Sequence, residues 1–220
     1  MKSFESIRKA AVKKHGQAEL NQRFSKPKSV RSLSATTDDR YLSAMSKCIF
    51  QAGFVWKVVE SMWPGFEEVF ADFVPEDLLA LSPKQVDAIK QDKRIIRNPQ
   101  KIKAVFDNAR FVARIAGEYG GFGKFLARWP QDDLAGLWAK LSKEGSRLGG
   151  ITGPRFLRYV GKDTFMLSPD VVNTLIAAGV IDKVPTGKAA LAACHQAFAR
   201  WHEESGRPYC ELSIIAACSV

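Results

Sequence analysis

The stretch Leu148–Val160, which reads LGGITGPRFLRYV, connects two predicted helices through a glycine-rich turn. Glycines in such a turn permit positive φ and let the main chain approach another molecule closely. Pro154 suits the first position of the following helix, whose first N–H groups have no partner within the helix and can bind a phosphate oxygen. We therefore predict a helical hairpin that binds a phosphate backbone. A tight turn between two helices, without a ligand, is the alternative.

Apolar residues recur at helical spacing on both sides of this turn. A long helix is predicted to begin at Pro99 and to end at the pair Gly120-Gly121. A short amphipathic helix is predicted over residues 4–15, ended by Gly16. A turn is predicted at Trp63-Pro64-Gly65, because proline and glycine interrupt the pattern there. No segment alternates convincingly as a strand would, so we expect an all-α fold.

The composition is that of an ordinary globular protein, with 220 residues of which 46% are hydrophobic and 25% are charged. No stretch approaches the apolar length of a membrane span, and the first residues lack the apolar core of a signal peptide. We expect a cytoplasmic protein with no membrane partner. The four cysteines form no C-x-x-C pair, which favours reduced thiols over disulfides.

The net charge of +10 is unevenly distributed along the chain. Residues 1–35 hold nine Lys or Arg and two Glu, so they carry +7 of this total. We predict a basic N-terminal arm and linker over residues 1–35 and one helical domain over residues 36–220. A basic arm favours polyphosphate partners. A solvated tail without a ligand is the alternative, and charge alone does not decide between them.

Two other segments resemble 3-methyladenine DNA glycosylase I, a family of the helix-hairpin-helix DNA glycosylase superfamily. Gln51–Trp56, QAGFVW, is similar to that family's Gln-Ala-Gly-Leu-Ser-Trp, and Arg94–Ala104, RIIRNPQKIKA, matches it in order and spacing. The turn Gly150–Gly153 resembles the superfamily's hydrophobic-Gly-hydrophobic-Gly hairpin, displaced by one residue. The resemblance spans residues 38–180. It implies a two-lobed, all-helical glycosylase that binds double-stranded DNA.

The resemblance also implies a catalytic carboxylate after the hairpin. In the superfamily a proline-containing loop delivers an aspartate to the mouth of the active-site cleft, and Asp170 matches that position. Cleavage of an N-glycosidic bond builds positive charge on the deoxyribose, which a fixed carboxylate stabilises while it orients or deprotonates water. The alternative is that Asp170 caps the helix over residues 171–178, and both roles can hold together.

The family's tryptophan lines the pocket for the flipped base, and Trp56 occupies that position. A flat, cationic methylated purine suits an aromatic face through stacking and cation–π attraction. Gln51 and Phe54 are candidates to shape the pocket, although aromatic residues at helical spacing also suit a core. The family carries a glutamate five residues before the glycine, where this chain has Cys48. That departure puts 3-methyladenine itself in doubt as the substrate.

Arg155 stands near the place where bifunctional members of the superfamily carry a lysine that forms a Schiff base. A guanidinium remains protonated and cannot be an amine nucleophile, so we predict a monofunctional enzyme. Four basic residues near Pro99 are open to phosphate contact or to plain solvation: Arg94, Arg97, Lys101 and Lys103. The residues expected at the DNA backbone are Gly150, Thr152, Gly153, Arg155 and Arg158.

The family's structural zinc is not expected in this chain. No cysteine precedes Cys48, and His15, His195 and His202 do not recreate the ligand set. The adjacent pair Cys194-His195 has poor ligand geometry on a helix and suits packing. We predict no metal, no cofactor and a monomer.

These features predict a monofunctional DNA glycosylase that excises N-alkylated, 3-methyladenine-like bases from duplex DNA by base flipping. A non-catalytic helix-hairpin-helix protein that binds DNA structure is the alternative, and Cys48 favours it. A helical protein–protein adaptor that binds no nucleic acid is the second alternative.

Overall fold

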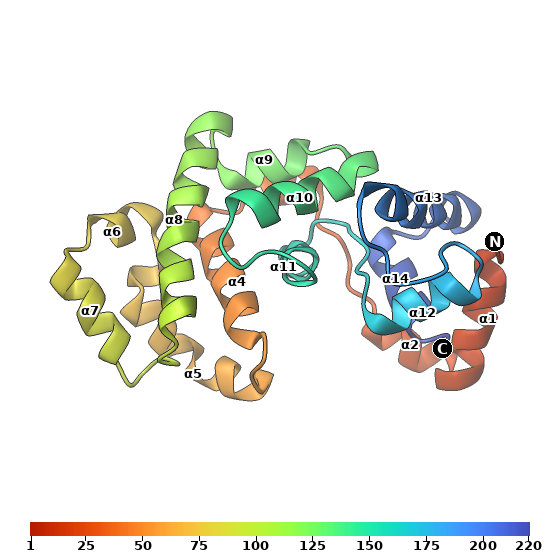
Figure 1. Ribbon diagram of the computed structural model, residues 1–220, viewed down its shortest axis with the longest axis horizontal. Coiled ribbons are helices and arrows are strands. Elements are labelled where there is room, and N and C mark those ends of the chain that lie inside the picture. Colours follow the sequence, from red (N-terminus) through yellow and green to blue (C-terminus); the bar gives the residue numbers. More distant parts are fainter. The chain divides into compact units, whose positions relative to one another are not determined.

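The structure is a computed structural model that describes residues 1–220. Its regular elements are all helices, which confirms the predicted all-α class (Figure 1). The chain forms two compact units, each built from separate stretches of sequence. Unit 1 contains residues 1–28, 130–138 and 161–220, and unit 2 contains residues 29–129 and 139–160.

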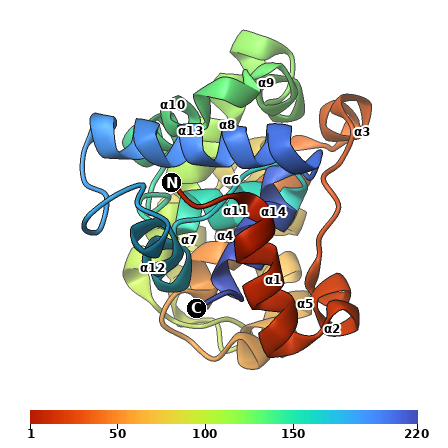
Figure 2. The same cartoon turned by 90° about the vertical axis from the view of Figure 1, so that its right-hand side faces the viewer.

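Unit 1 is made of helices from both ends of the chain. Its elements are α1 (Phe4–His15), α2 (Gln17–Arg23), the 3-10 helix η2 (Gln131–Asp133), α12 (Pro169–Ala177), α13 (Lys188–Ser205), α14 (Tyr209–Ala217) and the start of α10 (Leu134–Glu144). Figure 2 shows α1 beside α14, with the long α13 running across the unit. The predicted helix over residues 4–15 is confirmed with the same bounds.

The first 28 residues pack into the core of unit 1. Phe4 and Ile7 of α1 are buried in one apolar cluster with Phe198, Trp201 and Leu212. The Lys2 N–H donates to the carbonyl of Ala178 at 3.0 Å, and the Phe4 N–H donates to Glu204 at 2.9 Å. The sequence suggested a boundary at residue 35, whereas the chain passes from unit 1 to unit 2 after residue 28.

Unit 2 holds the glycine-rich hairpin. Its elements are α3 (Val30–Ala35), α4 (Asp38–Gln51), α5 (Trp56–Val69), the 3-10 helix η1 (Ala71–Phe73), α6 (Pro75–Ala80), α7 (Pro83–Gln91), α8 (Pro99–Tyr119), α9 (Phe122–Arg128), α11 (Thr152–Val160) and the end of α10. Helix α4 is buried along most of its length because α5, α8 and α11 all pack against it. The long α8 begins at Pro99 with Asn98 as its cap and ends at Gly120, as predicted.

The turn predicted at Trp63-Pro64-Gly65 is wrong, because α5 runs through these residues to Val69. Tertiary packing outweighs the proline: the Trp63 ring stacks on Phe73 of η1 with centroids 5.5 Å apart. Gly65 is needed for close approach, since a Cβ there would lie 2.8 Å from the carbonyl oxygen of Arg94. These contacts offset the hydrogen bond that Pro64 cannot donate within the helix.

Helices α3 and α9 approach each other at Gly123. A Cβ at this position would lie 2.3 Å from the Leu33 carbonyl oxygen and 3.0 Å from the Tyr41 ring. We expect Gly123→Ala to lower the free energy of unfolding by about 1–3 kcal/mol, because the buried contact is overpacked. Urea or thermal unfolding measures this change.

Gly117 provides the control for that substitution. It lies on the exposed side of α8, with nothing within 4 Å of a Cβ built there. Gly117→Ala is expected to raise the free energy of unfolding by roughly 0.5–1 kcal/mol, because alanine favours the helix. Equal stabilities for the two variants would contradict the tight α3–α9 contact.

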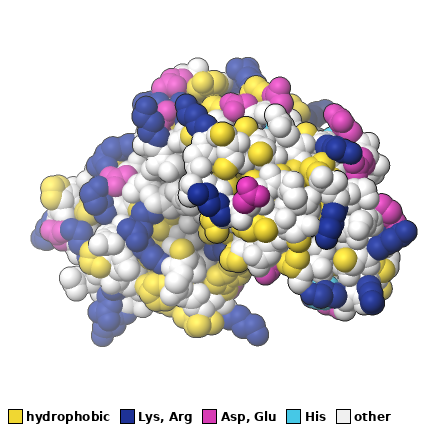
Figure 3. All heavy atoms as spheres, turned by 45° about the vertical axis from the view of Figure 1, so that its right-hand side comes forward, with side chains coloured by type: hydrophobic (Ala, Val, Ile, Leu, Met, Phe, Trp, Pro, Cys, Tyr) yellow, Lys and Arg dark blue, Asp and Glu magenta, His cyan; other side chains and the backbone are white.

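Lys and Arg side chains are spread over the face drawn in Figure 3, with Asp and Glu side chains interspersed among them. Such a distribution accords with the net charge of +10 and attracts polyanions at long range. None of the helices combines the length and the apolar character that a bilayer crossing requires.

Candidate nucleic-acid interface and base site

The hairpin turn needs glycine at two positions for different reasons. Gly150 has φ +57°, which favours glycine, and a Cβ at Gly153 would lie 2.6 Å from the Leu148 carbonyl oxygen. Helix α11 begins at Thr152, two residues before the predicted start, because the Arg155 N–H already donates to the Ile151 carbonyl at 3.0 Å. The N–H group of Ile151, which is half-buried, donates no hydrogen bond within the chain, so it remains available to an anion.

A buried asparagine holds the segment that leads into the hairpin. The Asn108 amide donates to the Ser146 carbonyl at 3.0 Å, and its oxygen accepts from the Ser146 N–H at 2.8 Å. Asn108 is fully buried, so these bonds are protected from water. The turn is therefore fixed to α8 and presents its amides on a rigid support.

A basic hollow of about 340 Å³ lies next to the turn. Its lining residues are Ile49, Ala52, Lys101, Arg147, Gly149 and Thr152. Two of these are cations and none is acidic. Burial of the Lys101 amine and the charge of Arg147 lower the pKa of Lys101. A hollow lined by two cations next to the unpaired Ile151 N–H is suited to an oxyanion such as a phosphate.

An exposed tryptophan with a cation on its face lies beside the hairpin. Trp56 begins α5 and is 51% exposed, and the Arg155 guanidinium carbon lies 4.9 Å from the centre of its ring. Tyr159, one turn further along α11, is 55% exposed, and the Lys47 amine lies 6.0 Å from its ring. We name this surface the α4–α5–α11 cluster; its members are Lys47, Gln51, Trp56, Glu60, Arg155 and Tyr159.

Gln51 is the buried member of this cluster, and Cys48 is buried next to it on α4. The Gln51 amide donates to Glu60 at 3.0 Å. Burial raises the pKa of the Cys48 thiol to about 12, against the opposing charges of Arg155 and Lys47. Cys48 is therefore a neutral, buried thiol at physiological pH.

Phe54 is exposed and lies against the Lys101 amine, which is 4.5 Å from the centre of the Phe54 ring. The same amine donates to the carbonyls of Phe50 at 3.1 Å and Ala52 at 2.6 Å, at the C-terminus of α4. A cation stabilises that helix end. Plain solvation of Lys101 is wrong, because the side chain is buried, whereas its contact with a phosphate stays a prediction.

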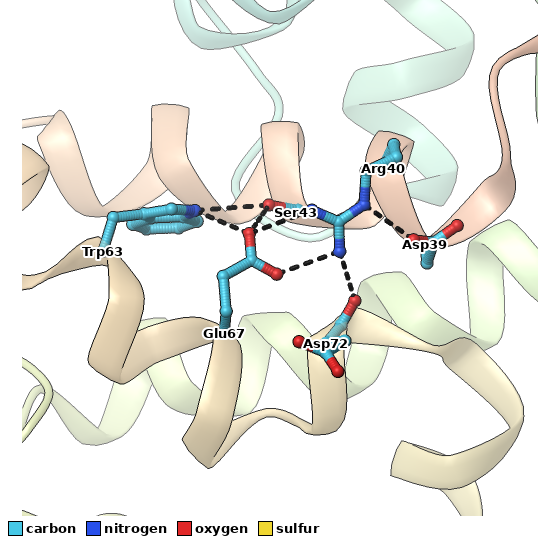
Figure 4. Close-up of polar contacts among 6 residues, drawn as sticks. All are labelled: Asp39, Arg40, Ser43, Trp63, Glu67 and Asp72. Carbon is cyan, nitrogen blue, oxygen red and sulfur yellow. Dashed lines mark hydrogen bonds and ion pairs between the residues drawn. The ribbon is translucent and has the colours of Figure 1, made fainter.

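A polar network anchors Trp63 under the cluster (Figure 4). The Trp63 indole N–H donates to Glu67 at 2.9 Å, the Ser43 hydroxyl donates to the same carboxylate at 2.7 Å, and Arg40 pairs with it at 2.9 Å. The Lys47 amine lies 5.2 Å from the centre of the fixed Trp63 ring. The network thus fixes the Trp63 ring against which the Lys47 amine lies.

Asp170 lies in unit 1, in the first turn of α12. The cap of this helix is Ser168, whose hydroxyl accepts from the Val171 N–H at 3.4 Å. The predicted alternative role of Asp170 as the cap is therefore wrong. Its side chain is exposed and forms no hydrogen bond or ion pair within the chain, which leaves both carboxylate oxygens available.

Asp163, in the segment between α11 and α12, has a structural role at the start of α14. Its carboxylate accepts from the N–H groups of Tyr209 at 3.0 Å and Cys210 at 2.9 Å, which begin α14. A carboxylate at a helix N-terminus satisfies unpaired N–H groups and the helix dipole. Of these two aspartates, only Asp170 is free to act on another molecule.

Comparisons with known proteins identify the family. The family model described as methyladenine glycosylase matches residues 32–143, which is half of the chain. The chain belongs to the methyladenine glycosylase family. The predicted resemblance and the enzyme class, a DNA glycosylase, are thereby confirmed.

Solved structures of DNA glycosylases share the fold of this glycosylase. 3-Methyladenine DNA glycosylase I from Staphylococcus aureus is 24% identical with a TM-score of 0.50, over 57% of this chain and 77% of that one. The 8-oxoguanine DNA glycosylase from Methanocaldococcus jannaschii is 14% identical with a TM-score of 0.57, over 96% and 89%. That from Thermotoga maritima is 12% identical with a TM-score of 0.56, over 97% and 95%.

Three of the basic residues near the start of α8 are engaged within the glycosylase. Arg94 pairs with Asp92 at 2.7 Å and Glu68 at 2.8 Å, and Lys103 pairs with Asp107 at 2.6 Å. Lys101 binds carbonyls as described above. Exposed ion pairs of this kind contribute little to stability. Arg147, which the sequence did not single out, lines the basic hollow together with Lys101.

In unit 1 of the glycosylase, Cys194 is buried and its neighbour His195 is partly exposed. The His195 ring lies 5.8 Å from the ring of Tyr209. No three His, Cys, Asp or Glu side chains of residues 1–220 gather as a metal site would require.

Sequence reasoning missed Lys47, Glu60 and Tyr159. Each lies four residues from a residue that the motifs identified, on the same helix: Lys47 from Gln51, Glu60 from Trp56 and Tyr159 from Arg155. Residues four apart share a helix face, so this spacing was the available signal.

Proposed function

We propose that this glycosylase is monofunctional and excises N-alkylated, 3-methyladenine-like bases from duplex DNA. The hairpin and the basic hollow bind the DNA backbone, the damaged base leaves the stack, and it stacks on Trp56. Asp170 then assists departure of the base. Extrusion selects for such a base, because a damaged base is weakly paired and costs less to unstack.

One observation carries the assignment of Trp56. The Arg155 guanidinium, which is a flat cation, already lies 4.9 Å from the centre of the exposed indole ring. An N-alkylated purine is also flat and cationic, so it suits the same face through cation–π attraction and stacking. When Arg155 turns to a phosphate, the face becomes free for the base.

In the proposed chemistry, Asp170 stabilises the positive charge on the sugar, and the alkylated base is itself a good leaving group. An alkylated purine departs as a neutral molecule and leaves positive charge on the sugar, so no strong general acid is needed. A carboxylate without a partner in the chain is suited to stabilise that cation and to accept a proton from the attacking water. Arg155 supplies no amine nucleophile, so no Schiff base forms.

The direct test measures free base released from alkylated, oxidised and deaminated duplexes incubated with the protein. Release of an alkylated purine without strand cleavage is expected. Duplex binding without release from any substrate would favour the non-catalytic DNA-binding alternative. The absence of both binding and release would favour the protein–protein adaptor.

Arg155→Ala is expected to weaken duplex binding and to reduce the slope of log affinity against log salt by about 1, since each phosphate contact releases counterions. The matched control is Arg114→Ala, because the Arg114 guanidinium is bound by Glu118 at 2.8 Å and Glu144 at 2.6 Å. Fluorescence anisotropy over a salt series measures both variants. An unchanged slope in Arg155→Ala would remove Arg155 from the DNA contact.

A further inference from the structure

Glu60 is fixed at the edge of the exposed Trp56 face. It lies one turn after Trp56 on α5, so the two side chains share a helix face. The Gln51 amide donates to one carboxylate oxygen at 3.0 Å, and the Lys47 amine pairs with the other at 2.8 Å. The carboxylate is therefore held by two partners from the neighbouring helix α4.

The partners of Glu60 are better buried than Glu60 itself. The side chain of Lys47 is 12% exposed and that of Glu60 is 51% exposed. Burial lowers the pKa of Lys47, but the hydrogen bond to Glu60 and the nearby Tyr159 outweigh this and raise it. The fixed Trp63 ring supports the same amine. The ammonium thus fixes the carboxylate from the protein side and leaves its outer side in solvent.

The outer side of Glu60 has capacity for another donor. A carboxylate offers about four lone-pair positions, and Gln51 and Lys47 use two of them. A ring stacked on Trp56 would bring its edge N–H groups toward these free positions. A cationic ring would gain more than a neutral one, because both the charge and the donors favour a carboxylate.

We propose that Glu60 determines specificity by reading the charge of the base on Trp56. This inference rests on the proposed function, since it requires a base on that face. Lys47 and Gln51 are positioning residues that hold the carboxylate. Discrimination between a cationic alkylated purine and its neutral parent then comes from one ordered carboxylate at the ring edge.

Purine binding to Glu60→Gln tests this inference without needing catalysis. The probes are 7,9-dimethylguanine, at a mildly acidic pH where it is a cation, and neutral 9-methylguanine. NMR titration follows the Trp56 indole N–H signal, which Trp56→Phe assigns. Glu60→Gln is expected to weaken binding of the cation about 10-fold, the value of one charge-assisted hydrogen bond, with the neutral purine nearly unaffected.

Glu68→Gln is the matched control, because Glu68 is an exposed, ion-paired glutamate on the same helix, bound to Arg94 at 2.8 Å. It should bind both purines as the wild type does. Equal weakening of both purines in Glu60→Gln, no weakening, or no change of the Trp56 signal in the wild type would overturn the inference. Base release from alkylated duplex, measured separately, decides the proposed function, so the two failures are distinguishable.

Discussion

Asp170→Asn is expected to lose base release by at least about 100-fold while it keeps its fold and its affinity for duplex DNA. The amide has nearly the shape of the carboxylate but cannot stabilise a sugar cation or accept a proton. Asp170 is exposed and unpaired, and Ser168 caps its helix, so the substitution breaks no contact within the chain. Single-turnover release of an alkylated purine measures the effect, and thermal unfolding verifies the fold.

Asp163→Asn is the matched control for this prediction. Asp163 accepts hydrogen bonds from the first N–H groups of α14, so its substitution should lower the free energy of unfolding by about 1–2 kcal/mol. Base release per folded molecule should stay close to that of the wild type. Full activity in Asp170→Asn, or loss of activity in both variants in proportion to stability, would remove Asp170 from the chemistry.

The helical class and several helix ends followed from local signals in the sequence. Helix α1 begins with the Ser3 cap and ends at Gly16, and α8 begins with the Asn98 cap before Pro99. Caps and breakers act through the residues next to them, so the chain reveals them directly. Pro64 misled for the opposite reason: the contacts that keep α5 continuous come from Phe73, Ser43 and Arg94, none of which is adjacent to it.

The position of the basic N-terminal segment could not be predicted from neighbouring residues either, because its contacts are with residues distant in the sequence. Its apolar face was visible in the sequence, but its partners lie about 200 residues away in the chain: the Phe4 ring lies 6.4 Å from the Trp201 ring. An amphipathic helix shows that it buries a face and does not show which surface covers it. The charge of this segment led to the idea of an arm, whereas Phe4 and Ile7 place it in a core.

The sequence could indicate the candidate site only where a family motif covers it. The motif supplied Trp56, Gln51 and the hairpin, and the structure brings Trp56, Gln51 and Arg155 into one cluster of unit 2. The sequence did not reveal that Cys48 lies buried while Glu60 occupies the surface. That choice depends on how α4 and α5 are rotated against each other, and the contacts between these helices include those of Trp63 with Ser43 and Lys47.

Trp56→Ala is the substitution that most directly tests the base site. Removal of the ring is expected to lower kcat/KM for release of an alkylated purine by roughly 10- to 100-fold, since base–aromatic stacking contributes about 1–3 kcal/mol. Trp56→Phe should recover part of this loss, because it keeps a smaller aromatic face. Stability should change little, because half of the Trp56 surface is exposed and its ring contact is with Arg155.

Leu79→Ala provides the comparison, because Leu79 on α6 is 40% exposed and lines a separate groove with Leu78 and Ile102. It removes exposed apolar surface without touching the α4–α5–α11 cluster, so its kcat/KM should equal that of the wild type. If Trp56→Ala also kept full kcat/KM, stacking on this ring would play no part in base recognition. If Trp56→Phe were as inactive as Trp56→Ala, the indole would act through its size or its contact with Arg155. Stacking of a cationic base on an aromatic face would then not explain the role of Trp56.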